Sequence, residues 1–184
     1  VVMWQLSVQA NDNWRLFSSI VYGSSLILLY TSSTLYHAIS AADIKRRLRQ
    51  LDHAAIFILI AGTYTPFTLI NLRDNWGLPL FGLIWLIAII GVIVEVATAL
   101  KYKKLSLALY LGMGWMVIIA IQPMLQYVEP GGLMLLLAGG LSYSAGVIFY
   151  IWKTLFMHHA IWHLFVLAGS VLHFLAVYYF VLPH

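Results

Sequence analysis

The sequence contains no cysteine and few charged residues, and each shortage excludes a class of protein or site. Without cysteine, a disulfide framework and a thiolate metal site are both excluded, so a metal would need histidine, aspartate or glutamate ligands. Charged residues make up 9% of the 184 residues, against about 25% in an ordinary soluble domain. Hydrophobic residues make up 62%, against about 45 to 50%. This balance is typical of a membrane protein.

Apolar runs of about 20 residues recur along the chain, and a helix of that length crosses a hydrocarbon core of about 30 Å. The runs are continuous and lack the alternation of a membrane barrel, so they predict an all-α, polytopic integral membrane helix bundle. The six predicted spans are residues 15–39, 50–72, 78–100, 105–127, 131–153 and 159–182. Pro79 and Pro130 fall at predicted helix starts, whereas Pro66 and Pro123 lie within spans and are expected to kink them.

The chain has no internal repeat, low-complexity tract or linker, which indicates a single transmembrane domain over residues 1–184. Residues 1–10 are too short to span a membrane and lack the basic segment that begins a signal peptide. We interpret them as the remnant of a truncated first helix. That helix would raise the number of spans from six to seven.

Basic residues predict the orientation of the bundle, because Lys and Arg accumulate in cytoplasmic loops. Residues 43–50 include four basic side chains, residues 101–104 include three, and Lys153 closes the fifth span. These positions lie in alternate loops, so they share one face, which we place in the cytoplasm. The C-terminus is then outside. The basic residues act as topology signals, and with no nucleic-acid-binding motif present, nucleic acid is not an expected partner.

The predicted topology also assigns a depth to each polar residue in the spans. Ser33 and His37 lie at the inner end of the first span, and Asp52 lies at the inner end of the second. His159 and His163 fall in the first turns of the last span, again at the inner end. Three helices are therefore expected to bring these side chains to one membrane level.

The spacing H-x-x-x-H places His159 and His163 on one helical face, about 6 Å apart along the axis. With His37 they would form a three-histidine metal site that leaves a fourth tetrahedral position for water, an arrangement typical of catalytic zinc. Zinc lowers the pKa of such a water to about 7. Asp52 could accept its proton or hold an imidazole in one tautomer, and Ser33 could hydrogen-bond the water or orient a ligand. These roles suggest hydrolysis of an amide or ester.

Other polar residues have simpler interpretations. His53, His158 and His184 are expected to be interfacial, satisfied by water and lipid headgroups. His173, near the middle of the membrane, has two possible roles: a helix-to-helix hydrogen bond or a position in a cavity. Glu95 also has two possible roles: it supports the metal site, or it is an interhelical partner.

Three motifs together resemble the hemolysin III branch of the progestin and adipoQ receptor superfamily: SSTLYH at 32–37, LDH at 51–53 and HAIWH at 159–163. The resemblance extends over the whole chain in span order. It implies a seven-helix membrane protein, N-terminus inside, with zinc held by three histidines near the cytoplasmic face. This chain departs from that pattern by lacking the first helix.

The family's motifs can be carried over residue by residue. Ser33 and His37 match its S-x-x-x-H motif, Asp52 matches its aspartate, and His159 with His163 matches its closing H-x-x-x-H motif. The resemblance therefore implies the same zinc ligands as the spacing and depth of the histidines.

The family's receptor members are similar to zinc-dependent ceramidases and bind hormones on their outer side. Its bacterial-type members carry a hemolysin name and are linked to membrane lipid or energetic homeostasis. The short loops of this chain offer no evident hormone-binding surface, which favours a bacterial-type member in a bacterial-type plasma membrane. No protein partner is evident.

Three functions are consistent with these features. The leading hypothesis is a zinc-dependent hydrolase of lipid amide or ester bonds, ceramidase-like, whose membrane lipid substrate enters from the inner leaflet. The first alternative is a non-enzymatic, hemolysin-like protein that perturbs membranes and uses zinc only to hold helices together. The second is a transporter or proton relay.

The predicted orientation can be tested by cysteine labelling, because the chain has no native cysteine. In intact cells, an impermeant thiol reagent is expected to label Pro183→Cys but not Lys103→Cys, since the basic loops face the cytoplasm. Permeabilised cells, in which both variants should react, provide the control. Labelling of Lys103→Cys from outside in intact cells would reverse the orientation.

Overall fold

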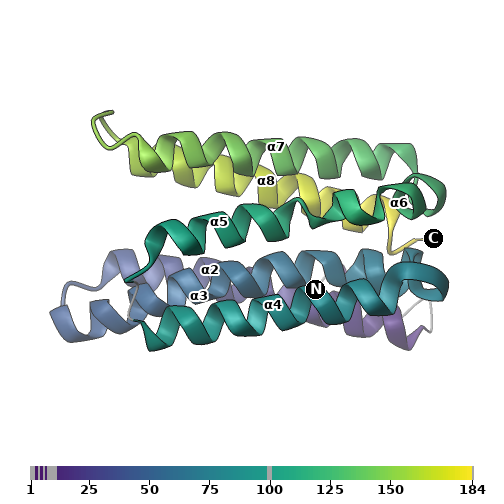
Figure 1. The fold of residues 1–184 in the computed structure, drawn as a ribbon, viewed down its shortest axis with the longest axis horizontal. Coiled ribbons are helices and arrows are strands. Elements are labelled where there is room, and N and C mark those ends of the chain that lie inside the picture. Colours follow the sequence, from purple (N-terminus) through teal and green to yellow (C-terminus); the bar gives the residue numbers. More distant parts are fainter. Residues whose placement is uncertain (1–2, 4, 6, 8–11, 99–100, 184) are drawn as a thin grey trace. The chain divides into compact units, whose positions relative to one another are not determined.

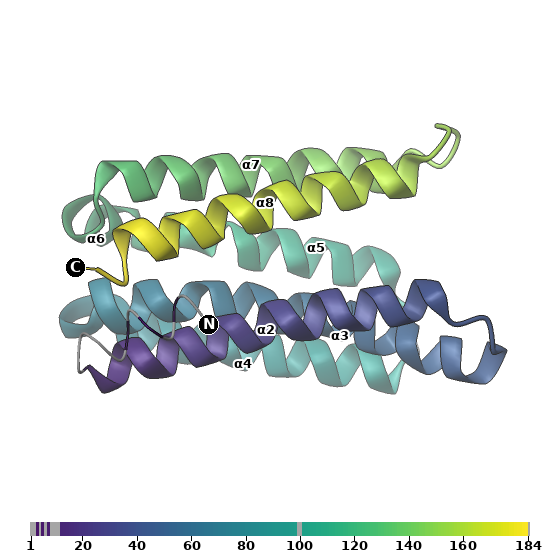
Figure 2. The same cartoon turned by 180° about the vertical axis from the view of Figure 1, so that it is seen from behind.

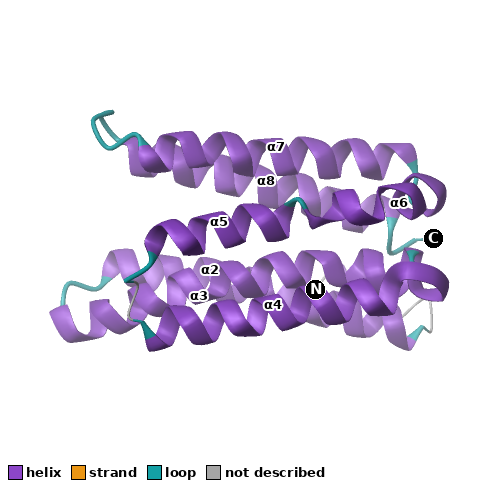
Figure 3. Ribbon diagram, in the orientation of Figure 1, coloured by secondary structure: helices purple, strands orange, loops and turns teal. Residues whose placement is uncertain are grey.

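The structure, a computed structural model, describes residues 3, 5, 7, 12–98 and 101–183. Every regular element in this described part is a helix (Figure 3). It contains six helices long and apolar enough to cross a membrane: Asn13–Ala38, Ala42–Asn71, Leu78–Ala97, Lys104–Tyr127, Pro130–Ile151 and His158–Phe180. The predictions of an all-α class and of six spans are therefore confirmed, and the chain is an integral membrane protein.

The chain divides into two compact units, Val1–Ala120 and Ile121–His184. The first unit contains α2 (Asn13–Ala38), α3 (Ala42–Pro66), α4 (Leu78–Ala97) and α5 (Lys103–Gly114), all labelled in Figure 1. The second contains α6 (Ile121–Tyr127), α7 (Pro130–Ile151) and α8 (His158–Phe180). The prediction of a single domain stays a prediction. Most of the predicted helix remnant at residues 1–10 lies outside the described residues.

Helix α3 is the central element of the first unit and packs against α2, α4 and α5. Within its most apolar window 67% of the residues are buried, against 17 to 33% in the other five spans. The core of this unit joins three helices and consists of Phe57, Ala61, Ile84, Ala88 and Met113. The residues that α3 carries are thus held by contacts on several sides.

Small residues allow these helices to approach closely, as expected where lipid competes with protein for apolar contacts. A Cβ added at Gly62 of α3 would lie 2.4 Å from Oγ of Ser25 on α2. A Cβ added at Gly91 of α4 would lie 2.4 Å from Cε1 of Phe57 on α3. Glycine is therefore needed at both positions for the spacing of the helices.

The main contact of the second unit joins α7 and α8, an antiparallel pair that lie side by side in both Figure 1 and Figure 2. Glycines of α7 again receive bulky side chains from α8, since a Cβ at Gly139 would lie 2.2 Å from Cδ2 of His173. The Nε2 atom of His173 donates to the carbonyl oxygen of Leu136 on α7 at 3.1 Å. The open question about His173 is thus answered by a helix-to-helix hydrogen bond.

Helix α3 begins at Ala42, so the predicted loop at residues 43–50 is helical. The link between α2 and α3 is three residues, 39–41, with extended backbone at Ile39 and Ala41. Such a link covers up to about 10 Å. Figure 1 and Figure 2 both show that α3 consequently begins beyond the end of α2. The basic side chains lie on this projecting part of α3.

The prolines within spans disturb the helices, although not always at the proline. Directly after Pro66 the backbone widens into the π-helical segments Phe67–Asn71 and Arg73–Gly77. Pro123 lies inside α6, and the irregular segment precedes it as a 3₁₀ turn over Met116–Ala120. This placement fits proline, whose ring clashes with the carbonyl four residues earlier. Pro79 and Pro130 lie in the first turns of α4 and α7, as predicted.

The break after α5 is repaired by one side chain. The hydroxyl of Tyr64 on α3 lies 2.9 Å from the carbonyl oxygen of Met113 and 3.0 Å from that of Gly114, to which it donates. It also accepts from the N–H of Val117 at 2.9 Å. Backbone groups freed within a membrane need such partners, because no water is present to satisfy them.

The contact between α3 and α4 can be tested with a pair of glycine substitutions on one helix. Gly91→Ala is expected to lower thermal stability, because its Cβ would overlap the Phe57 ring, and overpacking typically costs about 1 to 3 kcal/mol. Gly82→Ala is the matched control, since nothing lies within 4 Å of its added Cβ. Melting curves in detergent compare the two. Equal stability of both variants would contradict the close approach at Gly91.

Candidate metal centre

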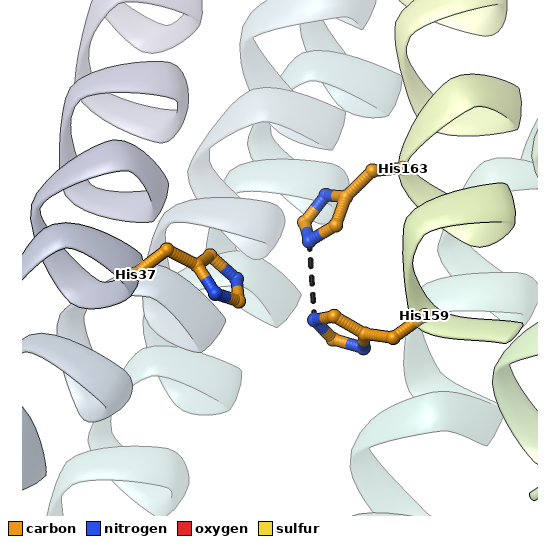
Figure 4. Close-up of side chains that lie close together, drawn as sticks. All are labelled: His37, His159 and His163. Atoms are coloured by element: carbon orange, nitrogen blue, oxygen red, sulfur yellow. Dashed lines mark hydrogen bonds between the residues drawn. The ribbon is translucent and has the colours of Figure 1, made fainter. Parts of the chain in front are cut away.

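Two of the predicted ligands, His159 and His163, lie one turn apart at the start of α8. Their Nε2 atoms are 3.1 Å apart, and the two rings are perpendicular with centroids at 4.7 Å. Figure 4 shows the Nε2 atoms pointing toward each other. The helical spacing of four residues places both side chains on one face. The predicted pair is therefore present in the fold.

The separation of these two nitrogen atoms suits a metal ion. Two nitrogen ligands at about 2.0 to 2.1 Å from a tetrahedral zinc lie about 3.3 Å apart, close to the 3.1 Å between the Nε2 atoms. Both rings are half-buried. Neutral imidazoles can bind a metal through Nε2, and histidine is the ligand type that a chain without cysteine must use for zinc.

Aromatic packing holds the pair in place. Trp162 lies between the two histidines in sequence, with its ring centroid 5.2 Å from that of His159 and 4.5 Å from that of His163. Across the helix pair, the ring of Tyr150 on α7 lies 5.1 Å from Trp162. These contacts restrict the rotamers of the imidazoles, so less conformational entropy is lost when a metal binds.

The third predicted ligand, His37, is the penultimate residue of α2 and is exposed. It belongs to the first unit, whereas His159 and His163 belong to the second. Figure 4 draws the side chains of all three histidines.

The two predicted catalytic residues lie on α2 and α3. Ser33 is one turn before His37 on α2 and is half-buried. Asp52 is buried, with 6% of its surface exposed. Asp52 lies about 15 Å along α3 from its first residue, and α3 begins beyond the end of α2 (Figure 1). The projection of α3 therefore returns Asp52 toward the membrane level of Ser33 and His37.

The prediction for His53 was wrong, because this side chain has a protein partner. Its Nδ1 atom lies 3.4 Å from Oε1 of Glu95 on α4. The other carboxylate oxygen of Glu95 accepts from the hydroxyl of Ser106 on α5. Glu95 is therefore an interhelical partner, one of its two expected roles. His158 is half-buried next to His159, and His184 lies outside the described residues.

Two residues of this cluster had not been singled out in the sequence. One is Ser106, and the other is Tyr110, whose hydroxyl donates to the backbone carbonyl of His53 at 2.9 Å. Both lie one or two turns into α5, directly after the basic residues 101–104. A polar side chain at the inner end of an apolar span was the available signal, because such groups need partners in the membrane.

Comparison with known proteins gives related sequences over most of the chain. The sequence model of a family described as haemolysin-III related matches residues 1–174. Hemolysin-3 of Bacillus cereus is 48% identical over 163 residues, 89% of this chain and 74% of that protein. The Hemolysin-3 homolog of Bacillus subtilis (strain 168) is 44% identical, over 91% of this chain and 78% of that protein.

A human relative is more distant. The monocyte to macrophage differentiation factor of Homo sapiens is 32% identical over 179 residues, 92% of this chain and 72% of that protein. No solved structure gives a significant match to the chain.

The histidine pair is expected to bind a divalent transition metal in solution. His159→Ala and His163→Ala should each weaken zinc binding by at least about tenfold, because each removes one of few ligands. His158→Ala is the matched control, since its side chain points about 100° away from that of His159. Zinc titration and the rise of the melting temperature on zinc addition measure the effect. Equal zinc affinity of all three variants would exclude the pair as ligands.

Proposed function

The chain belongs to the haemolysin-III-related family, and from this premise we propose that it is a zinc hydrolase of amide or ester bonds in membrane lipids. The observation that carries the proposal is the histidine pair of α8, whose Nε2 atoms lie 3.1 Å apart. Three-histidine sites with an open position are typical of catalytic zinc, whereas structural sites are closed.

His37 is the third ligand in this proposal. Its support is chemical, since the imidazole of His37 is the same kind of neutral nitrogen donor as those of His159 and His163. Further support comes from the predicted topology, which brings the end of α2 and the start of α8 to the same face of the membrane. Three neutral imidazoles leave zinc with its full charge, which favours its action on a carbonyl.

When bound, zinc would lower the pKa of a water molecule to about 7 and polarise the substrate carbonyl. Asp52 acts as the general base that takes a proton from the attacking water, and it returns that proton to the leaving nitrogen or oxygen. A bond forms between the water oxygen and the carbonyl carbon, and the C–N or C–O bond breaks. The products are a fatty acid and an amine or alcohol. Ser33 donates a hydrogen bond that orients the substrate.

The burial of Asp52 supports this role. A carboxylate with 6% of its surface exposed is unfavourable in a membrane span by about 2.5 to 3.5 kcal/mol at the centre, and by less near the interface. Chains retain such groups where they serve proton transfer or binding. The position of Asp52 on the central helix α3 also keeps it in a fixed orientation.

A lipid can reach such a site laterally. An open groove runs along α2 and is lined by Leu26, Ile27, Tyr30, Thr31, Thr34 and Leu35. Its inner end is within one turn of Ser33 and His37 on the same helix. We assign the groove to an acyl chain of a substrate from the inner leaflet of the plasma membrane, with the C-terminus outside and the metal centre near the cytoplasm.

The names of two relatives favour a second candidate function. Both Bacillus proteins are called Hemolysin-3 or its homolog. In this alternative the protein perturbs membranes without turnover, and zinc only holds helices together. Leakage of dye from liposomes, measured beside release of lipid products, separates the two functions.

Asp52→Asn is expected to keep near-stoichiometric zinc and a normal melting curve but to lose lipid hydrolysis by at least about a hundredfold, because the amide cannot accept the proton. His37→Ala should lose both zinc affinity and turnover. Asp43→Asn, an exposed aspartate in the first turn of α3, is the matched control. Product release from ceramide, acyl amide and phospholipid substrates is measured with zinc-loaded protein in proteoliposomes.

Two results would contradict the proposal in different ways. Full turnover by zinc-loaded Asp52→Asn would remove Asp52 as the base and leave the hydrolase intact. Absence of product from the wild-type protein on all three substrate classes, with zinc still raising its melting temperature, would favour the structural role of zinc.

A further inference from the structure

A second polar cluster lies wholly within the first unit, where three helices meet. It consists of His53 on α3, Glu95 on α4 and Ser106 on α5. Glu95 has 1% of its side chain exposed and His53 has 19%. None of these residues belongs to the proposed metal centre. The cluster therefore needs an explanation of its own.

The hydrogen bonds of Glu95 leave one carboxylate oxygen available. Oε2 accepts from the hydroxyl of Ser106. Oε1 is buried and has no hydrogen-bond donor among the described residues, and Nδ1 of His53 faces it at 3.4 Å. A buried anion with an unfilled acceptor is unfavourable, because transfer of charge from water into a low-dielectric region costs several kcal/mol. A proton on the carboxyl group or on the imidazole removes this cost.

The elements around Glu95 supply few other charges. From α3 the facing titratable group is His53, preceded by the buried Asp52, and Gln50 binds the carbonyl oxygen of Val96 at 3.2 Å. From α5 the facing group is the neutral Ser106. The basic side chains of residues 101 and 104 are exposed. His53 is therefore the titratable side chain that lies against the carboxylate.

The exposed fractions of His53 and Glu95 indicate a route for a proton between water and the carboxyl group. His53 is partly accessible, and Glu95 lies behind it. Both are near the basic ends of their helices, since Arg49 is one turn before His53 and Lys101 follows α4. An imidazole at the surface with a carboxyl group behind it is an arrangement through which a proton can be exchanged with water.

We propose that Glu95, His53 and Ser106 form a proton-binding site in which the carboxyl group of Glu95 and the imidazole of His53 share one proton, and His53 exchanges it with the aqueous phase. The ligand is a proton, and the site is separate from the proposed zinc centre. The hydroxyl of Ser106 stabilises the ionised carboxylate, and the imidazolium of His53 does so by charge. Loss of either partner must therefore favour the protonated acid.

A hydrophobic carbodiimide tests this site, because it reacts with protonated carboxylic acids in apolar surroundings. The acid O–H adds across one C=N bond of N,N′-dicyclohexylcarbodiimide, and rearrangement gives a stable N-acylurea with no leaving group. Peptide mass spectrometry of the full chain in detergent should find this adduct on Glu95. The rate should rise as the pH falls, and Glu95→Gln should lack the adduct. A water-soluble carbodiimide should instead modify the exposed Glu129.

The partner variants make the test specific. At neutral pH, His53→Gln should be labelled at Glu95 about tenfold faster or more, since loss of an adjacent cation favours the protonated acid. Ser106→Ala should change the rate in the same direction by a smaller factor. Tyr110→Phe is the matched control on α5, because its hydroxyl binds the carbonyl of His53 and not the carboxylate. Its labelling rate should equal that of the wild type.

Melting curves establish that each variant is folded before labelling. If His53→Gln does not fold, the labelling rate of Glu95 in Ser106→Ala tests the effect of losing a partner. Absence of labelling on Glu95 in the folded wild type, or a rate that does not depend on pH, would overturn the proton site. Wild-type rates in both partner variants would overturn the roles of His53 and Ser106. None of these outcomes depends on zinc or on lipid turnover.

Discussion

Polar groups inside a membrane have to be satisfied by the protein itself, and the use of the few polar residues in this chain follows from that constraint. The helices satisfy their own backbone, and where the fourth span breaks, Tyr64 supplies the missing partners. His173 reaches the carbonyl of Leu136 on the neighbouring helix. Glu95 is paired with side chains from two other helices. Each polar side chain thereby joins elements that apolar contacts alone would join less specifically.

The same constraint explains why α3 is central. Lipid chains are as apolar as leucine, so helices associate by close packing and polar contacts rather than by the hydrophobic effect. Glycine and alanine on α3 and α4 allow that packing, as at Gly62 and Gly91. Asp52 and His53 are neighbours on this central helix, one assigned to the proposed zinc chemistry and the other to the proton site. The rigidity of α3 serves both roles.

The histidine pair of α8 was predictable because it depends on local geometry alone. Residues four apart on a helix face the same side wherever that helix lies, so His159 and His163 could be paired from their spacing. The pairing of His53 with Glu95 depends on the register between α3 and α4, which no spacing along the chain encodes. For that reason His53 was predicted to be interfacial, and Ser106 was missed.

Hydropathy and length were sufficient to predict the class, the number of spans and most of their limits, because the hydrocarbon thickness imposes the same requirement on every helix. The early start of α3 at Ala42 and the break near Trp115 were decided by the fold. Helix α3 starts early because it projects beyond the end of α2. The break near Trp115 is tolerated because the side chain of Tyr64 on α3 replaces the lost backbone partners. Such contacts join residues distant in the chain, so only the packed helices determine them.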